Sequence, residues 1–412
     1  MKQLFSLGCL FLWGALSPCR AEVVVRTDFE GGNAEVISLN QQTATLRIQP
    51  SIREGRGWPC WWYFRVEGLK PGQQFTLELQ AQTKPYLGKN ILNASWCQPK
   101  HASISLDGIQ WKPSPKGEFT KEKIAIYRIT AESDVLWMAW GPPFVPTNAE
   151  ALLASLAAKA LESQRFELAK TRGGRAVPGI RVGAIDAPNQ VWVNARQHAW
   201  ESGGSWVGKG FIEWVCGDDP AAVALRANTC IHFIPIMDVD NVTLGAGGKD
   251  ADPRDLNRDW ASEPIYPEVA AAQKRIREIH QRHGLDVFID LHNPGPDDPV
   301  FFFGPFGFEN LKGINLRNYQ RWLELAAPRI HEPLRLDPKY HFANYVKTDE
   351  ERGRMSSGWV RANTGPATIS LTLETAWNSP LCTSEGYGKI GAGLGRTLAA
   401  YLKENPRRQP TP

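Results

Sequence analysis

The sequence has no long apolar segment and no cluster of basic residues. Its one extended apolar stretch, residues 4–16, is shorter than the roughly 18 residues that a transmembrane helix requires. Lysine and arginine total 47 against 43 aspartates and glutamates, for a formal net charge of +4, and they are scattered along the chain. We therefore predict neither a membrane span nor a nucleic-acid partner. Nothing in the sequence specifies an oligomeric state.

Residues 1–21 have the pattern of a secretory signal peptide. Lys2 gives a positive start, residues 4–16 form the apolar stretch, and Cys19-Arg20-Ala21 is a small-x-small cleavage site. We therefore predict that residues 1–21 are removed and that the protein is secreted or periplasmic.

Cysteine is scarce, and no two cysteines stand in a C-x-x-C pair, which excludes a zinc ribbon. Five cysteines follow residue 21. Cys60 with Cys97 and Cys216 with Cys230 are candidate disulfides, because each pair lies within one predicted domain and an exported chain permits such bonds. The odd cysteine that remains is expected to be a buried free thiol.

Residues 22–145 show the alternation of apolar and polar residues that predicts half-buried strands. Residues 44–48 and 75–79 alternate in this way, and turns such as Lys70-Pro71-Gly72 separate the strands. We predict an N-terminal β-sandwich domain that ends in the proline-rich segment 141–146. Its tryptophans have two open interpretations, packing or a sugar-binding surface. They are Trp58, Trp61, Trp62, Trp96, Trp111, Trp137 and Trp140.

Between residues 146 and 405 strand and helix patterns alternate, which favours an α/β domain with a mostly parallel or mixed sheet flanked by helices. Strands are predicted at 180–183, 191–195, 230–236, 287–289 and 368–373, and helices at 149–161, 206–215, 220–229, 269–283 and 387–403. The polar, proline-rich residues 406–412 are predicted to be a disordered tail.

Three side chains with metal-ligand chemistry follow predicted strands, where the sites of α/β sheets gather. His198 and Glu201 follow strand 191–195 in an H-x-x-E spacing, and His292 ends the strand that begins at residue 287. Two imidazoles and one carboxylate suit Zn²⁺ and leave a fourth position for water or substrate. The H-x-x-E spacing is common by itself, and hydrogen-bonded loop residues would look the same.

Two further groups suit chemistry beside such a metal. Glu374 follows the apolar strand 368–373 and there could take a proton from water, although a salt-bridged surface glutamate is the alternative. Asn257 and Arg258 stand side by side, and a guanidinium holds a carboxylate by two parallel hydrogen bonds, although a surface ion pair is the alternative. Asp290 either orients a metal ligand or caps a turn.

Taken together and in this order, these pieces resemble the zinc carboxypeptidases, and among them the cytosolic carboxypeptidase branch. The patterns of that branch are H-x-x-E, D-L-N-R, D-x-H and T-x-E, which here are His198–Glu201, Asp255–Arg258, Asp290–His292 and Thr372–Glu374. Residues 61–66 (WWYFRV) also look like a strand of that branch's own β-sandwich. The resemblance therefore covers about residues 25–400.

The resemblance implies a peptidase with one Zn²⁺ per chain, held by His198, Glu201 and His292. It further implies that Glu374 is the general base and that the Asn257–Arg258 pair holds the terminal carboxylate of a peptide substrate.

The sequence departs from the family at two positions. Members usually have an oxyanion-stabilising arginine about ten residues before the Asn–Arg pair, where this chain has Gly248, so the adjacent Lys249 is the candidate source of positive charge. Many members also have a tyrosine about 22 residues before the catalytic glutamate, and Tyr345 is the nearest one upstream here.

We therefore expect a zinc metallocarboxypeptidase that hydrolyses a C-terminal peptide bond. Two alternatives stay open. A zinc amidase or deacylase would act on small N-acyl or cell-wall substrates that have no free carboxylate. A non-catalytic peptide- or glycan-binding protein would bind zinc without turnover.

Overall fold

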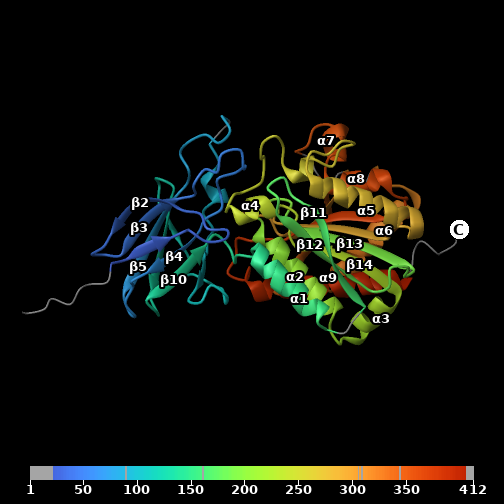
Figure 1. Cartoon of the computed structure of the whole chain (residues 1–412), viewed down its shortest axis with the longest axis horizontal. Helices are drawn as coiled ribbons and strands as arrows, with labels where there is room; N and C mark the ends of the chain where they lie inside the picture. The colour runs from blue at the N-terminus through green and yellow to red at the C-terminus, as the bar shows by residue number, and fades with distance from the viewer. Residues whose placement is uncertain are drawn as a thin grey trace, which may run out of the picture.

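The computed structural model describes residues 22–88, 91–159, 162–304, 306–307, 310–342 and 345–404. The predicted signal peptide and the predicted tail, residues 406–412, lie outside the described residues. Figure 1 shows a smaller β lobe, blue to teal, beside a larger lobe of sheet and helices. Of the residues that the structure describes, none forms a helix both long and apolar enough to cross a membrane.

The N-terminal lobe is all-β, as predicted, and its described residues form two sheets of five strands each. The first sheet has the order β1 (Val24–Arg26), β4 (Tyr63–Glu67), β10 (Val135–Ala139), β6 (Ser103–Ser105) and β7 (Lys112–Pro113). The second has the order β2 (Glu35–Asn40), β3 (Thr45–Gln49), β5 (Gln74–Gln80), β9 (Ile124–Thr130) and β8 (Glu118–Phe119).

The tryptophans of this lobe pack in its core or against it. The same cluster includes Trp200 and Trp377 of the second lobe, so the core of the β lobe extends across the boundary. Trp140 lies at the centre of this contact, because its ring centroid is 5.1 Å from that of Trp200 and 4.4 Å from that of Trp377.

The second lobe is built on a mixed sheet, as predicted, with eight strands in the described part of the chain. Its order is β11 (Ser163–Lys170), β12 (Ala176–Val182), β14 (Thr229–Ile234), β13 (Asn189–Ala195), β15 (Val287–His292), β18 (Ile369–Glu374), β16 (Val300–Gly304) and β17 (Leu336–Phe342). The four central strands β14, β13, β15 and β18 are parallel. Strands β13, β14 and β15 are buried along their whole length, as expected where helices cover both faces.

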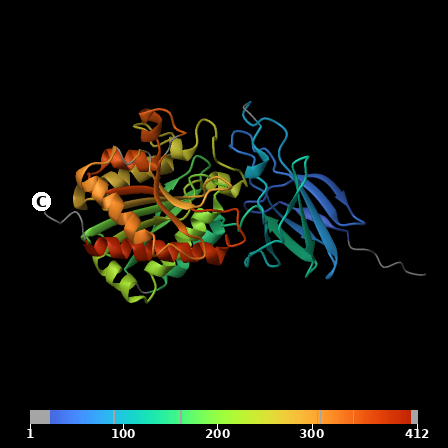
Figure 2. The ribbon, with the colours of Figure 1, turned by 180° about the vertical axis from the view of Figure 1, so that it is seen from behind.

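Helices flank this sheet (Figures 1 and 2). They are α1 (Pro146–Ala157), α2 (Ser202–Val215), α3 (Pro220–Asn228), α4 (Val239–Thr243), α5 (Pro267–His283), α6 (Gly313–Ala326), α7 (Asp349–Gly353), α8 (Ser356–Asn363) and α9 (Ser384–Glu404), with 3-10 turns η1 (Ala94–Trp96) and η2 (Leu256–Arg258). Helices α2 and α9 pack together on one face, while α5 and α8 lie on the other.

Local sequence explains where several helices begin and end. Helix α1 starts at Pro146, three residues before the predicted start, because proline suits the first turn of a helix. Helix α5 buries Val269, Ala272 and Ile276 at helical spacing. It stops before Gly284, whose φ of 77° favours glycine.

The predicted disulfides are wrong, because all five described cysteines are buried free thiols. Neither Cys60–Cys97 nor Cys216–Cys230 is bonded. Two of these thiols have polar contacts nearby instead. Cys97 Sγ donates to the carbonyl of Ala94 at 3.3 Å, and Cys230 Sγ lies 3.5 Å from Nε2 of His232. Burial raises the pKa of Cys97 to about 12, which makes its thiol unreactive.

Candidate active site

Three adjacent parallel strands end at one edge of the sheet and bring the predicted metal ligands and the predicted base together. Strand β13 ends at Ala195, just before the loop that carries His198 and Glu201. On the neighbouring strands, His292 of β15 and Glu374 of β18 are direct register partners. The carboxyl ends of parallel strands thus form the site, as is general for α/β sheets.

The carboxylate of Glu201 lies between the two imidazoles. Its Oε1 is 2.8 Å from Nδ1 of His198, and its Oε2 is 2.6 Å from Nδ1 of His292. All three side chains are buried, and one ligand atom from each lies within 4.8 Å of the others. Such a buried group of two nitrogens and one carboxylate fits Zn²⁺.

A carboxylate stands behind each imidazole. Asp290 Oδ2 is 2.9 Å from Nε2 of His292, and Asp255 Oδ1 is 3.6 Å from Nε2 of His198. At 2.9 Å, Asp290 favours the tautomer of His292 with a free Nδ1, the atom that faces Glu201. The contact of Asp255 with His198 is longer than a hydrogen bond and acts through charge. The D-L-N-R motif by itself does not predict this position of Asp255 near His198.

These charges perturb one another strongly. Burial opposes the charged form of Glu201, yet the adjacent imidazoles of His198 and His292 lower its pKa to about 2. Burial likewise opposes the charged form of Asp255, but Lys249 and His198 hold its pKa well below the usual range. The site therefore keeps anionic carboxylates that attract a cation.

Glu374 faces the same space from β18. Its Oε2 is buried without a hydrogen-bond partner among the described residues. Burial raises the pKa of Glu374 to about 7. A carboxylate whose pKa lies near neutrality can both accept and release a proton, which suits a general base.

The predicted substrate-binding residues lie beside the metal ligands, in the lining of the same cavity. Asn257 is buried, and its Oδ1 accepts a hydrogen bond from the backbone N–H of Ser356 at 2.8 Å. Arg258 is partly exposed and donates to the carbonyl of Asn257 at 2.9 Å. Nζ of Lys249 is 3.4 Å from Oδ2 of Asp255, so its charge is shared with that carboxylate.

The three candidate metal ligands and Glu374 line one cleft of about 500 Å³, hereafter the site cleft, together with Lys249, Asn257 and Arg258. Asp255 and Asp290 do not line it. Both lobes contribute to its wall, since Trp58 and Trp96 come from the β lobe and Trp200 from the second lobe. Trp206, six residues after Trp200, does not line the cleft and donates from Nε1 to the carbonyl of Pro142 at 2.9 Å. The lining residues are Trp58, Trp96, His198, Trp200, Glu201, Lys249, Asp250, Asn257, Arg258, His292, Asn293, Pro294, Gly295, Asp298, Phe301, Phe303, Tyr345, Met355, Thr372 and Glu374.

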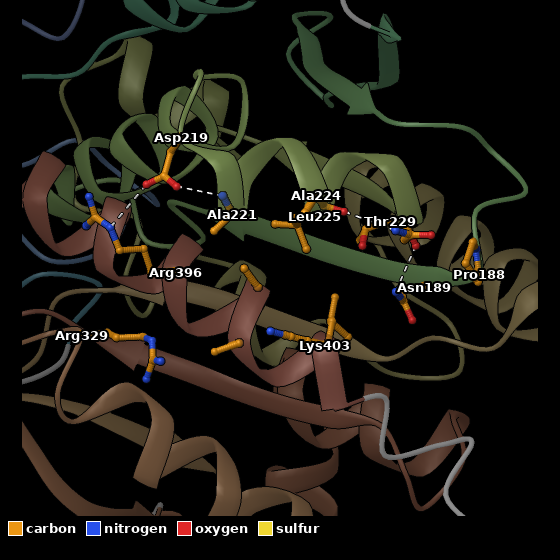
Figure 3. Close-up of a pocket in the computed structure, with 14 residues that line it drawn as sticks. Pro188, Asn189, Asp219, Ala221, Ala224, Leu225, Thr229, Arg329, Arg396 and Lys403 are labelled. Carbon is orange, nitrogen blue, oxygen red and sulfur yellow. Dashed lines mark hydrogen bonds and ion pairs between the residues drawn. The ribbon is translucent and has the colours of Figure 1, made fainter.

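A larger cavity of about 660 Å³ lies elsewhere, between α3 and α9 (Figure 3). Ala221, Ala224 and Leu225 of α3 line it, as do the basic residues Arg329, Arg396 and Lys403. None of the predicted site residues lines it.

Two protein-family models match the chain. The cytosolic carboxypeptidase N-terminal domain matches residues 25–140, and the zinc carboxypeptidase domain matches residues 150–293. The chain belongs to the zinc carboxypeptidase family. Its β lobe places it in the cytosolic carboxypeptidase branch of that family. The second match includes all three candidate zinc ligands and ends before Glu374.

Curated relatives are distant. Cytosolic carboxypeptidase 3 of Bos taurus is 21% identical over 322 residues, which are 73% of this chain and 32% of the relative. The chain thus spans about a third of the length of that cytosolic carboxypeptidase. A protein of Zymomonas mobilis without an assigned function is 25% identical over 308 residues, 74% of this chain and 76% of its own length.

Solved structures of bacterial proteins share the fold. A metallo-carboxypeptidase from Burkholderia cenocepacia has a TM-score of 0.78 at 22% identity and covers 93% of this chain and 100% of its own. A metallo-carboxypeptidase from Pseudomonas aeruginosa, in complex with (2-guanidinoethylmercapto)succinic acid, has a TM-score of 0.74 at 22% identity over the same shares. The predicted fold class is confirmed.

Proposed function

We propose that this chain is a zinc-dependent metallocarboxypeptidase that removes the C-terminal residue of a peptide. The observation that carries this proposal is the convergence of His198, Glu201 and His292 beside Glu374 at the edge of the sheet. Bound zinc would act as a Lewis acid toward the scissile carbonyl and would make water more acidic.

The protein's own groups supply proton transfer. Glu374 accepts a proton from the attacking water and delivers it to the leaving amine. Its unpartnered Oε2 is free for this contact, and its raised pKa of about 7 lets one carboxylate serve in both directions.

The polar end of the site cleft selects a free carboxylate. Arg258 is partly exposed and uses one guanidinium nitrogen to donate to the carbonyl of Asn257, which leaves other N–H groups for a ligand. The backbone N–H of Ser356 holds the side chain of Asn257 in place. We infer that this pair holds the C-terminal carboxylate by charge-assisted hydrogen bonds. Lys249 adds positive charge near the scissile carbonyl and keeps Asp255 ionised.

The test compares zinc content and peptide trimming for the wild type, Glu374→Gln and a control, Glu385→Gln. Glu385 is an acidic residue in the first turn of α9 and lies outside the site cleft. We expect about one zinc per chain in all three proteins and loss of single C-terminal residues by the wild type and the control. Loss of a general base should slow Glu374→Gln by about 10²–10⁴-fold.

Other outcomes would redirect the proposal. Hydrolysis of N-acyl amides without a free carboxylate, at a rate equal to that of peptides, would favour an amidase. Zinc binding with no hydrolysis would favour a binding protein, and absence of zinc would refute the ligand assignment.

A further inference from the structure

One part of the site cleft is apolar. Phe301, Phe303 and Met355 line the cleft and, together with Val346, form a small hydrophobic cluster separate from the two large cores. We call Phe301, Phe303 and Met355 the apolar wall. These side chains are buried against one another and Val346, and they also form part of the surface of the cleft.

The apolar wall adjoins the proposed base. Strand β16 runs antiparallel to β18, with Phe301 opposite Glu374 and Phe303 opposite Thr372. Directly opposed residues of paired strands project on the same face of a sheet. The two rings therefore stand on the face from which Glu374 enters the cleft.

The other end of the wall adjoins the proposed carboxylate site. Met355 directly precedes Ser356, whose backbone N–H donates to Oδ1 of Asn257 at 2.8 Å. The wall thus extends from Glu374 to the Asn257–Arg258 pair. Tyr345 continues it toward solvent, because its ring stacks on Phe303 with centroids 6.3 Å apart and planes 5° apart.

We propose that the apolar wall selects peptides that end in a large apolar or aromatic residue. The inference rests on the proposed function. If the terminal carboxylate lies on the Asn257–Arg258 pair and the scissile carbonyl lies beside Glu374, the side chain of the terminal residue falls between them, against the wall.

The positions of the charged side chains in the cleft support a preference for apolar terminal residues. Among the described residues that line it beyond the metal ligands and Glu374, the charged ones are Lys249, Asp250, Arg258 and Asp298, and none belongs to the apolar wall. Lys249 contacts Asp255, and Asp250 accepts a hydrogen bond from Trp58 Nε1 at 3.0 Å. A glutamate or lysine side chain against the wall would therefore be buried without a partner, which is unfavourable.

The test measures kcat/KM of the full-length zinc enzyme on five peptides that differ only in the terminal residue: phenylalanine, leucine, alanine, glutamate or lysine. We expect kcat/KM for the phenylalanine and leucine peptides to be at least about tenfold higher than for the alanine peptide. It should be about 100-fold higher than for the glutamate and lysine peptides. Ratios between substrates do not depend on the fraction of active enzyme.

Three variants complete the test. Met355→Lys places a cation in the wall and should raise the glutamate-to-phenylalanine ratio at least about tenfold. Tyr345→Ala alters a side chain that is 59% exposed, so folding is not at risk, and should reduce the phenylalanine-to-alanine ratio about threefold or more. Leu381→Lys is the control, an exposed leucine outside the cleft, and should leave every ratio unchanged.

The outcomes separate the inference from the function on which it rests. Equal or faster cleavage of the glutamate or lysine peptide by the wild type overturns the inference and leaves the carboxypeptidase assignment intact. Unchanged ratios in both Met355→Lys and Tyr345→Ala also overturn it. If none of the five peptides is cleaved, the proposed function fails and the inference fails with it.

Discussion

Replacing Asp290 by asparagine should weaken zinc binding although Asp290 is not one of the three candidate ligands. Its Oδ2 lies 2.9 Å from Nε2 of His292 and accepts from Ser356 Oγ at 2.6 Å, and its Oδ1 accepts from Asn194 at 2.7 Å. The carboxylate is fully buried, so each contact is protected from water. Together they fix the ring of His292 and its tautomer.

The size of the effect follows from these contacts. A hydrogen bond to a charged group contributes about 1.5–3 kcal/mol. Loss of a carboxylate that orients a metal-binding histidine typically costs about 10–100-fold in metal affinity. That factor corresponds to about 1.4–2.8 kcal/mol, so the two estimates agree. Asparagine keeps the shape but presents an amide N–H where an acceptor is needed.

The assay is zinc competition with a chromophoric chelator, combined with thermal unfolding to confirm that the variant is folded. Asp337→Asn is the matched control, because Asp337 makes a similar contact to Nε2 of His341 at 3.0 Å on the partly exposed strand β17. We expect unchanged zinc affinity for the control. A folded Asp290→Asn protein with zinc affinity within twofold of the wild type would refute the reasoning.

Two other predictions concern stability. Burial raises the pKa of Glu268 to about 8 from 4.5, so the folded state retains a proton that the unfolded state has lost, and the free energy of unfolding should fall by up to about 4 kcal/mol between pH 5 and 8. Glu268→Gln should remove this fall in the free energy of unfolding. Denaturant unfolding of both proteins at pH 5 and pH 8 measures it, and an equal fall in the variant would contradict the explanation. Trp140→Ala should lower the free energy of unfolding by about 3–5 kcal/mol because Trp140 fills the contact between the lobes. Trp140→Phe should lower it less, and equal losses for the two variants would contradict that explanation.

The sequence predicted the parts of the site that depend on neighbouring strands. Buried parallel strands have distinctive apolar runs, and β13, β15 and β18 were each recognised from such a run. Because the carboxyl ends of parallel strands lie together, His198, His292 and Glu374 could be placed at one edge before their distances were known. The edge strands β11 and β17 were missed because they carry mixed, partly exposed residues.

The pattern of the sequence does not predict contacts between loops that are distant along the chain. The approach of Asp255 to His198 joins residues far apart in the sequence, and no periodicity signals it. The same holds for Trp58 and Trp96, whose place in the cleft depends on how the β lobe packs on the second lobe. The predicted disulfides failed for a related reason, since spacing does not show which way a buried thiol points.

The β lobe takes part in building the site. The backbone N–H of Trp58 donates to the carbonyl of Lys249 at 2.9 Å, and that of Gly248 donates to the carbonyl of Arg56 at 2.9 Å. Gly57, with a φ of 83°, permits this approach, because a Cβ there would lie 2.2 Å from the carbonyl oxygen of Lys249.

These contacts link the β lobe to the candidate metal ligands through a short series of neighbours. Backbone bonds hold Lys249, its ammonium lies 3.4 Å from Asp255, and Asp255 lies 3.6 Å from His198. A side chain held by fixed neighbours loses less freedom when it binds, so this series should preorganise the site. Trp58 in the cleft wall comes from the same loop, which means that ligand orientation and cleft shape both depend on the packing of the two lobes.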